Sequence, residues 1–306
     1  MTTGTTFRLG TRGSPLALTQ AAMVRDALCA AHGWSANRVE TVVIRTTGDR
    51  VQDRALAEIG GKALWTKELD RALLAGEVDA CVHSMKDVET VRPRSIAIAA
   101  TLPRADVRDR LIGAASIAAL PSGAVVGTSS PRRRAQLLRR RPDLSIVLFR
   151  GNVDTRLAKL AAGEADATLL AAAGLLRLDR PDVGVAIDTD VMLPAPAQGA
   201  VGIEVRAGDD RACGWVGAID HANTSRCIAT ERALLAALKA DCHSPVAALA
   251  RIEADTLRLD AELLDEDGAA HVVGALVGAL DEPLGDRLAA DLLARAPDPV
   301  RRLFAA

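Results

Sequence analysis

The stretch FRLGTRGSPLALTQAAMVRDALCAAHG (residues 7–33) joins a predicted strand, a turn and a capped helix. Its first four residues have the composition of a strand, Ser14 and Pro15 suit the N-cap and first turn of a helix, and Gly33 suits the helix end. Arg12 lies in the turn between the strand and the helix. Free backbone N–H groups and the positive end of a helix dipole favour an anion at such a turn. We therefore expect a strand–turn–helix unit that can bind an anion.

The same plan recurs later in the chain. GTSSP (127–131) resembles GTRGSP (10–15), and LAAGEADATL (160–169) resembles LLAGEVDACV (73–82). Each similarity involves small residues and is weak by itself, but the two occur in the same order. Together they predict two similar α/β units whose helix N-termini line a shared cleft.

The plan changes after the second unit. Residues 193–206 end in a strand that can return to the first unit, and after Asn223 come a helix, three alternating strands and a final helix from about Glu282. This last pattern is typical of a small α+β domain. The predicted fold class is α/β, with two similar α/β domains around a cleft plus a small C-terminal α+β domain. We expect three domains, which comprise residues 1–100 with 200–218, residues 101–199, and residues 219–306.

Composition limits the possible functions. The 306 residues are 49% apolar and 25% charged, as in a globular protein, and the formal net charge is −1. A near-neutral chain with 2% aromatic residues lacks the basic field and stacking platforms of a single-strand nucleic-acid-binding protein. Its five widely spaced cysteines form neither a disulfide framework nor a zinc-ligand pattern. Because the sequence has no signal-peptide plan and no apolar run that could span a bilayer, we expect a cytoplasmic protein.

The stretch GTSSPRRRAQLLRRRPDL (127–144) has six arginines within ten positions. They could grip nucleic acid, cover a solvated helix face or hold a small polyanion. Arg132, Arg133 and Arg134 lie in the first helical turn, where a cation is disfavoured unless an anion is bound. The arginines at 139–141 lie at the other end of the helix, where cations are favoured, and we expect them to be solvated. The first three are therefore candidates for gripping the carboxylates of a ligand.

The segment VHSMKDVE (82–89) lies just past the end of an apolar strand, where open α/β sheets place their ligands. Lys86 and Asp87 could form a surface ion pair. In a site, the lysine would hold a substrate carboxylate and the aspartate would handle a developing positive charge. His83 and Cys81 share a strand face and could bind a metal, but no third ligand is in sight, and a packed core histidine is the favoured interpretation.

Cys242 lies in ADCHSP (240–245), between a helix end and a strand, where its thiol could meet solvent. Most lone cysteines are inert packing residues, but an exposed one facing the cleft could be a nucleophile or the attachment point of a covalent cofactor. The sequence has no GxSxG elbow and no GxGxxG loop. The residues alone therefore fit either an anion-binding receptor or an enzyme that acts on a polycarboxylate.

A resemblance to a known family goes further. Six motifs, in their order and spacing, resemble those of the hydroxymethylbilane synthases, also called porphobilinogen deaminases. They are GTRGSPLALTQA, VHSMKDVE, GTSSPRRRAQL, RGNVDTRLAKL, PAQGAVGIE and ERALLAALKADCHSPV.

The resemblance implies an enzyme of tetrapyrrole (porphyrin and haem) biosynthesis with three domains, the first two like periplasmic binding proteins. Such an enzyme joins four porphobilinogen molecules head to tail with loss of ammonia, and hydrolysis then frees hydroxymethylbilane. A dipyrromethane cofactor, linked by a thioether to a cysteine, primes the chain. The resemblance also implies a monomer that binds porphobilinogen and needs no metal, nucleic acid or membrane.

The resemblance assigns roles to residues of this chain. Cys242 matches the cofactor-bearing cysteine, and Asp87 matches the catalytic aspartate, whose carboxylate stabilises cationic pyrrole states and assists proton transfer. Because every pyrrole ring carries an acetate and a propionate, the ligand is a polycarboxylate. The matching cofactor- and substrate-binding positions are Arg12, Ser14, Lys86, Ser129, Arg132, Arg133, Arg150, Arg156, Arg177 and Gln198.

The chain departs from the family pattern at a few positions. Ala240 and Asp241 precede the cysteine where Gly-Gly is common, and Ala197 stands where Gly is usual. Trp65 replaces a frequent Phe, and Glu58 stands where some members have Lys. These departures affect loops more than chemistry.

Two alternatives to the enzyme remain at this point. One is a two-lobed anion-binding protein without catalysis. The other is a nucleic-acid-binding protein that uses the arginine cluster, which would show steeply salt-dependent binding.

Overall fold

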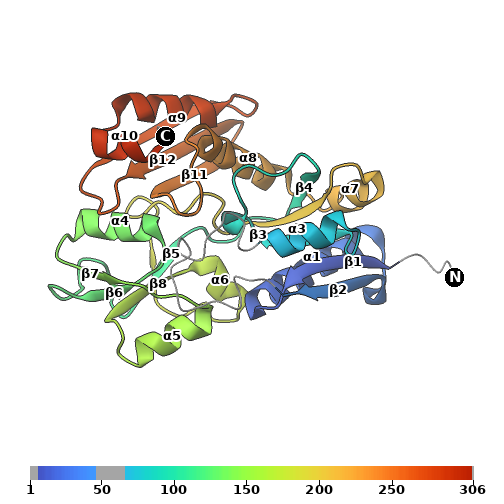
Figure 1. Ribbon diagram of the computed structural model, residues 1–306, viewed down its shortest axis with the longest axis horizontal. Helices are drawn as coiled ribbons and strands as arrows, with labels where there is room; N and C mark the ends of the chain where they lie inside the picture. The colour runs from blue at the N-terminus through green and yellow to red at the C-terminus, as the bar shows by residue number, and fades with distance from the viewer. Residues whose placement is uncertain (1–5, 46–65, 305–306) are drawn as a thin grey trace. The chain divides into compact units, whose positions relative to one another are not determined.

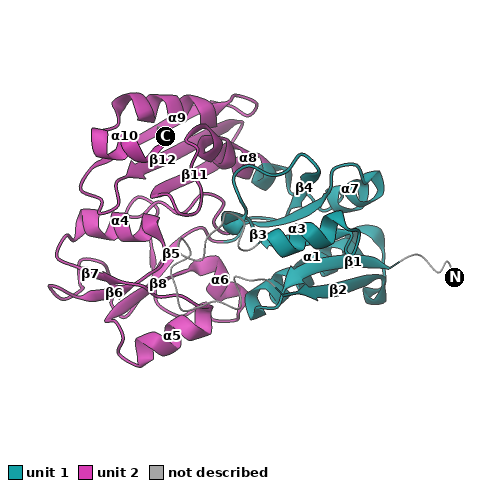
Figure 2. Ribbon diagram, viewed as in Figure 1, with its two compact units in different colours: residues 1–105, 200–225 teal, residues 106–199, 226–306 magenta. Residues whose placement is uncertain are grey.

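The computed structural model describes residues 6–45 and 66–304, whose helices and strands are drawn in Figure 1. The chain forms two compact units, coloured separately in Figure 2. The first comprises Met1–Ala105 and Ala200–Ser225, and the second comprises Asp106–Gly199 and Arg226–Ala306. The division into three domains with the boundaries given above stays a prediction.

The first unit is built on a five-stranded sheet with the order β2-β1-β3-β10-β4. β1 runs parallel to β2 and β3, whereas β10 runs antiparallel to both β3 and β4. β10 comes from the segment expected to return to the first unit, so that prediction is confirmed. The strands are β1 (Phe7–Arg12), β2 (Val39–Ile44), β3 (Ala80–Ser84), β4 (Ile96–Thr101) and β10 (Val201–Arg206).

The helices of the first unit begin and end where local chemistry requires. Ser14 caps the first helix by accepting a hydrogen bond from the Ala17 N–H, and Gly33 ends it with φ 63°, a left-handed conformation that glycine adopts without strain. Phe7 of β1 and Leu28 of this helix lie in the core of the unit. The elements are α1 (Pro15–His32), η1 (Ala36–Arg38), α3 (Lys67–Leu74), η2 (Met85–Asp87) and α7 (Asp210–Gly217).

The second unit contains a five-stranded sheet with the order β7-β6-β8-β5-β9. β6 runs parallel to β7 and β8, whereas β5 runs antiparallel to β8 and β9, which repeats the pattern of the first sheet. The prediction of two similar α/β units is confirmed. The elements are β5 (Asp109–Ile112), β6 (Val125–Gly127), α4 (Pro131–Arg140), β7 (Ser145–Val147), α5 (Val153–Ala161), β8 (Ala167–Ala171), α6 (Ala172–Arg177) and β9 (Val185–Ile187).

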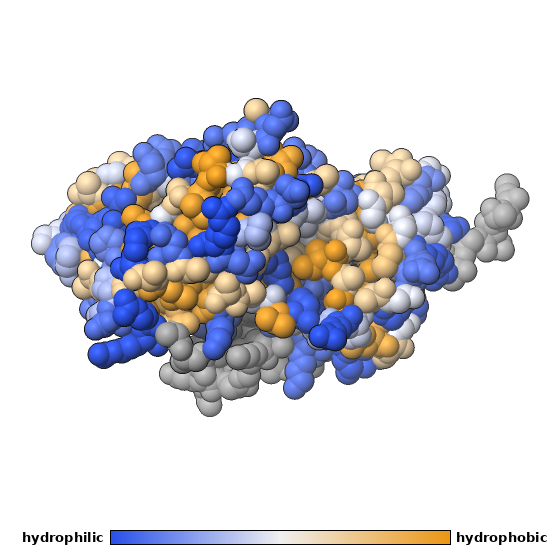
Figure 3. Space-filling model, turned by 90° about the horizontal axis from the view of Figure 1, so that it is seen from above, coloured by the Kyte–Doolittle hydropathy of each residue, from blue (hydrophilic) through white to orange (hydrophobic). Residues whose placement is uncertain are grey.

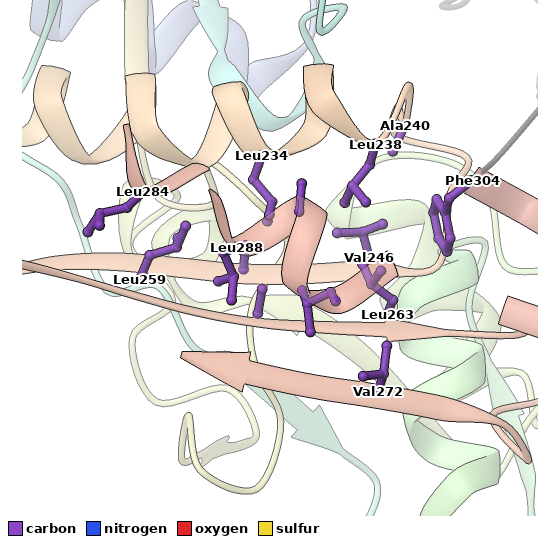
Figure 4. Packing of buried hydrophobic residues seen from close by; sticks show 14 of the residues in the cluster. Leu234, Leu238, Ala240, Val246, Leu259, Leu263, Val272, Leu284, Leu288 and Phe304 are labelled. Atoms are coloured by element: carbon purple, nitrogen blue, oxygen red, sulfur yellow. The ribbon is translucent and has the colours of Figure 1, made fainter. Parts of the chain in front are cut away.

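The C-terminal part of the second unit is a three-stranded antiparallel sheet packed against helices, as expected for an α+β domain. Its core joins Leu234 of α8, Leu238 just after that helix, Leu259 and Leu263 of β12, and Leu288 of α9 (Figure 4). The elements are α8 (Ala222–Ala237), β11 (Val246–Glu253), β12 (Thr256–Leu264), β13 (His271–Ala279), α9 (Leu284–Arg295) and α10 (Asp298–Phe304).

The surface carries no dominant feature on the face drawn in Figure 3, where polar residues alternate with smaller apolar patches. Among the described residues, no helix combines the length and the apolar character that crossing a bilayer requires.

Candidate active site

The candidate site residues fall in both compact units, and we describe each unit by itself. Arg12, Ser14, Lys86 and Asp87 belong to the first unit. The second unit holds Ser129, Arg132, Arg133, Arg150, Arg156, Arg177, Gln198 and Cys242.

Lys86 and Asp87 lie in a single 3₁₀ turn, η2, directly after β3. Both side chains are half-buried. The turn is closed by the Val88 N–H, which donates to the Met85 carbonyl at 3.3 Å. Arg12 ends β1, which is the parallel neighbour of β3. Because neighbouring parallel strands end at the same edge of a sheet, Arg12 and the Lys86–Asp87 turn share the edge where such folds bind ligands.

Ser14 already has a structural task. Its side-chain oxygen lies 3.3 Å from the Ala17 nitrogen and satisfies one of the unpaired N–H groups at the start of α1. The hydroxyl keeps its own proton for a further acceptor. A contact between Ser14 and a ligand stays a prediction.

Arg132 and Arg133 lie in the first turn of α4, as predicted, but they are only 3% and 5% exposed. Each donates through Nη2 to one oxygen of Asp109 at 2.7 Å. Gln198 donates to the same carboxylate, with Nε2 2.9 Å from Oδ1. Arg133 also donates to the Leu169 carbonyl at 2.8 Å. Asp109, at the start of β5, is therefore the centre of a buried cluster that the sequence analysis missed.

The electrostatics of this cluster leave a surplus of positive charge. Burial alone would raise the pKa of Asp109, but the adjacent guanidinium groups of Arg132 and Arg133 outweigh it and lower the pKa well below its ordinary value. Burial lowers the pKa of Arg132. One carboxylate thus faces two guanidinium groups, and the Nε atoms of both arginines are buried without an acceptor in the described parts of the chain. An anionic ligand would relieve both conditions.

The other predicted anion-binding residues of the second unit lie around α5 and α6. Arg156 of α5 donates to the Ser129 hydroxyl at 3.2 Å and to the Gly151 carbonyl at 3.0 Å. Arg150 is 7% exposed. Arg177, at the end of α6, donates to the Gly199 carbonyl at 2.7 Å. Burial lowers the pKa of Arg177, so a bound carboxylate would stabilise its charged form.

The expectation that the arginines at 139–141 are solvated is wrong for two of them. Arg139 forms an ion pair with Glu262 of β12. Arg141 donates to the carbonyls of Leu120 and Ile117 at 2.9 and 3.1 Å and pairs with an aspartate two residues on. Arg140 alone is exposed, as expected. The difference arises because the end of α4 packs against a strand and a loop that lie far away in the sequence.

Cys242 is exposed, whereas the other cysteines are buried or half-buried. It lies in a turn between α8 and β11 that Asp241 shapes. The Asp241 carboxylate accepts a hydrogen bond from the His243 N–H at 2.8 Å, and the Asp241 N–H donates to the Ser244 hydroxyl at 3.1 Å. The aspartate that replaces a common glycine thus holds the turn by its side chain, while Ala240 is buried in the adjacent core.

Ala197 shows why glycine is usual at its position. Its φ of 61° lies in the left-handed region, where a side chain is strained. Its N–H donates to the Glu231 carboxylate, which is fully buried, and the next residue is Gln198. Two other departures from the family pattern, Glu58 and Trp65, lie outside the described residues.

His83 is a buried core histidine, 6% exposed, whose Nε2 lies 3.1 Å from a carboxylate oxygen of Glu204 on β10. Within residues 6–45 and 66–304, no three histidine, cysteine or acidic side chains come together as a group that could hold a metal ion. The partner of His83, like Asp109, carried no signal in the sequence because the register of distant strands brings it into place.

Comparisons with known proteins agree along the chain. Residues 7–213 match the family model described as porphobilinogen deaminase, dipyromethane cofactor binding domain, and residues 225–294 match the one described as porphobilinogen deaminase, C-terminal domain. The chain is 58% identical over 305 residues to a porphobilinogen deaminase of Sphingopyxis alaskensis, covering 98% of this chain and 96% of the relative. It is 52% identical over 296 residues to that of Paracoccus denitrificans, covering 95% of each.

Among solved structures, the chain is similar to a periplasmic binding protein of Salmonella typhimurium with high arginine specificity. The sequence identity is 14% and the TM-score is 0.40, over 72% of this chain and 94% of the other.

Proposed function

Because the chain belongs to the porphobilinogen deaminase family, we propose that Asp87 and Cys242 carry the chemistry of this family in it. The enzyme is a transferase of tetrapyrrole biosynthesis, a hydroxymethylbilane synthase, and its substrate is porphobilinogen. Four porphobilinogen molecules are joined head to tail with loss of ammonia, and hydrolysis releases the linear product.

Cys242 is the proposed attachment point of the cofactor, through a thioether. When bound, dipyrromethane supplies the primer to which porphobilinogen units are added. The observation that supports this assignment is the exposure of Cys242 in a turn held by Asp241. A thiol held at the surface by a structured turn can reach a ligand that a buried thiol cannot.

The arginines of the second unit are proposed to hold the carboxylates of the cofactor and the growing chain. The residues fit such a group, because Arg132 and Arg133 share one carboxylate and keep buried Nε atoms without an acceptor in the described ranges. Arg177 likewise keeps a buried Nε without one. Arg150, Arg156, Ser129 and Gln198 would complete the set, together with Arg12, Ser14 and Lys86 of the first unit.

Asp87 is proposed to act on the substrate nitrogen atoms. Loss of ammonia from porphobilinogen leaves positive charge on the pyrrole system, and a half-buried carboxylate stabilises such charge more strongly than water does. The same carboxylate can accept or return a proton as the bond between pyrrole rings forms. Lys86, its neighbour, would hold a carboxylate of the substrate.

The intact mass of the purified protein, with peptide mapping around Cys242, tests the attachment. We expect an excess equal to one dipyrromethane on the Cys242 peptide, and none in Cys242→Ser. Cys213→Ser, which changes a half-buried cysteine elsewhere, is the matched control and should keep the excess. An unmodified protein that gains no pyrrole units from porphobilinogen would instead indicate a binding protein without catalysis.

The proposal also includes a monomeric enzyme in the cytoplasm that uses no metal, membrane or nucleic-acid partner. The formal net charge of −1 supports the last point, because nucleic-acid binding relies on basic surfaces. Sedimentation of the loaded enzyme would test the oligomeric state.

A further inference from the structure

We propose that Glu204 and Arg92 are positioning residues that hold the Lys86–Asp87 turn in place for the reaction. This inference rests on the role proposed for Asp87. Glu204 lies on β10 and is fully buried, and the Arg92 side chain is 8% exposed. Neither residue belongs to the set that would touch the cofactor or substrate.

The N-terminal side of the turn is tied in three ways to β10 and the residue just before it. The Met85 N–H donates to the Ala200 carbonyl at 3.1 Å. The Met85 side chain lies against Gly202, where a Cβ would overlap its sulfur. His83, two residues before Met85, places Nε2 3.1 Å from Glu204 Oε2. Ala200, just before β10, and the alternate residues Gly202 and Glu204 on it thus support the chain as it enters the turn.

The C-terminal side of the turn is tied to the same carboxylate. Arg92 donates through Nε and Nη2 to the two oxygens of Glu204, both at 2.8 Å. It also donates to Asp70 of α3 at 2.6 Å, to Glu89, which lies two residues after Asp87, and to the Thr66 hydroxyl at 3.5 Å. The Thr66 hydroxyl also donates to Glu89 at 2.7 Å. Glu204 therefore links to the chain both before and after the turn.

The hydrogen bonds of the buried Arg92 guanidinium group fix its position, and this position in turn fixes the segments that it joins. Arg92 presents a planar fork, and its partners come from α3, β10 and the segment after the turn. A lysine in its place could not reach all of them at once. Since small displacements of a reacting group cost much of its rate, rigid support of the turn would appear in turnover.

Glu204→Gln tests the proposal, with Asp79→Asn as its matched control. Asp79 directly precedes the same strand, β3, and its buried carboxylate pairs with Arg8, away from the turn. We expect the cofactor-loaded Glu204→Gln enzyme to lose about tenfold to about 100-fold in kcat, with the KM for porphobilinogen within about twofold of the wild type. Asp79→Asn should keep kcat. Equal loss of kcat in both variants, or loss in neither, would overturn the proposal.

Two further variants keep the test decisive. If Glu204→Gln does not fold, Arg92→Lys takes its place: a lower kcat at unchanged KM supports the proposal, and an unchanged kcat overturns it. In an Asp87→Asn background, Glu204→Gln should cause no additional loss, because a residue that acts through Asp87 has nothing left to position. Additive losses would contradict positioning, whereas full activity of Asp87→Asn alone would refute only the role of Asp87.

Discussion

The two five-stranded sheets share one arrangement of parallel and antiparallel neighbours, yet they bury carboxylates in opposite surroundings. In the second unit, Asp109 on β5 meets two arginines, Arg132 and Arg133, so positive charge is in excess. In the first unit, Glu204 on β10 meets one arginine, Arg92, which also pairs with two other carboxylates, so three carboxylates share one guanidinium group. β5 and β10 occupy equivalent places in their sheets.

The difference follows from where each carboxylate lies along its strand. Asp109 is opposite Ala171, the last residue of β8, and so reaches the sheet edge where α4 begins. Glu204 is opposite Cys81, near the start of β3, and lies deeper within its unit. The same sheet arrangement thus holds two buried arginines around a carboxylate in one unit and one buried arginine bonded to several carboxylates in the other. The Asp109 and Glu204 clusters therefore differ in their balance of charge and not in the arrangement of their strands.

The largest expected effect comes from breaking the positive cluster. Asp109→Asn leaves two buried guanidinium groups without their counter-charge, so we expect the free energy of unfolding to fall by roughly 3–5 kcal/mol. Urea unfolding measures this loss. Asp291→Asn, which breaks the exposed pair with Arg295, is the control and should change stability little. A similarly small change in Asp109→Asn would mean that the arginines do not depend on that carboxylate.

The second effect is a pH dependence specific to the negative cluster. Burial opposes the charge of Glu204, but hydrogen bonds from His83 and Arg92 prevail and lower its pKa from the ordinary 4.5 to about 2. A lowered pKa stabilises the folded state above about pH 4.5, and this stabilisation is lost as the pH falls toward about 2. Asp70 acts in the opposite sense, because burial raises its pKa and protonation then favours folding.

Glu204→Gln should therefore lose about 3 kcal/mol of stability at pH 7, and the difference from the wild type should shrink as the pH falls below about 4.5. Denaturant titrations at a series of pH values measure this difference. Asp109→Asn sharpens the comparison. The pKa of the wild-type Asp109 carboxyl is lowered further than that of Glu204, so the loss of stability in Asp109→Asn should persist to more acidic pH. A gap for Glu204→Gln that stays constant with pH would contradict the assigned pKa.

The third effect tests packing beneath the Lys86–Asp87 turn. Gly202→Ala places a methyl group against the Met85 sulfur, and overpacking of this kind costs about 1–3 kcal/mol. Gly208→Ala is a control just beyond the same strand, where the added carbon meets nothing within 4 Å. Thermal unfolding compares the two variants. Equal melting temperatures would mean that Met85 moves aside freely and does not rest on β10.

Helix ends and turns could be predicted from the sequence because each depends on residues only a few positions apart. Ser14 and Gly33 bound α1 as predicted, and Pro131 starts α4. The repeat of small residues predicted two similar sheets, and the apolar run before Arg206 predicted the returning strand.

The partners in the buried ion pairs could not be predicted from the sequence, because strand register and helix packing bring them together. Asp109 lies 23 residues from Arg132, and Glu204 lies 112 residues from Arg92. The sequence predicts a solvated Arg139 because it gives no sign of the partner, Glu262, which is 123 residues away. In this chain the sequence indicated which segments carry the candidate site residues, but not which buried charged groups those residues contact.

The smallest effect concerns the loop that delivers Gln198 to Asp109. Ala197 has a strained φ of 61°, and glycine at this position would relieve about 1–2 kcal/mol of strain. Ala197 is also only 2% exposed, so the same change would remove a buried methyl group and would increase the entropy of the unfolded chain. We expect Ala197→Gly to change the free energy of unfolding by less than about 0.5 kcal/mol. Ala254, with φ 52° in the exposed turn between β11 and β12, has no buried methyl to lose. Ala254→Gly should therefore gain about 0.5 kcal/mol in urea unfolding, and a larger gain in Ala197→Gly would mean that loop strain opposes the Asp109 cluster.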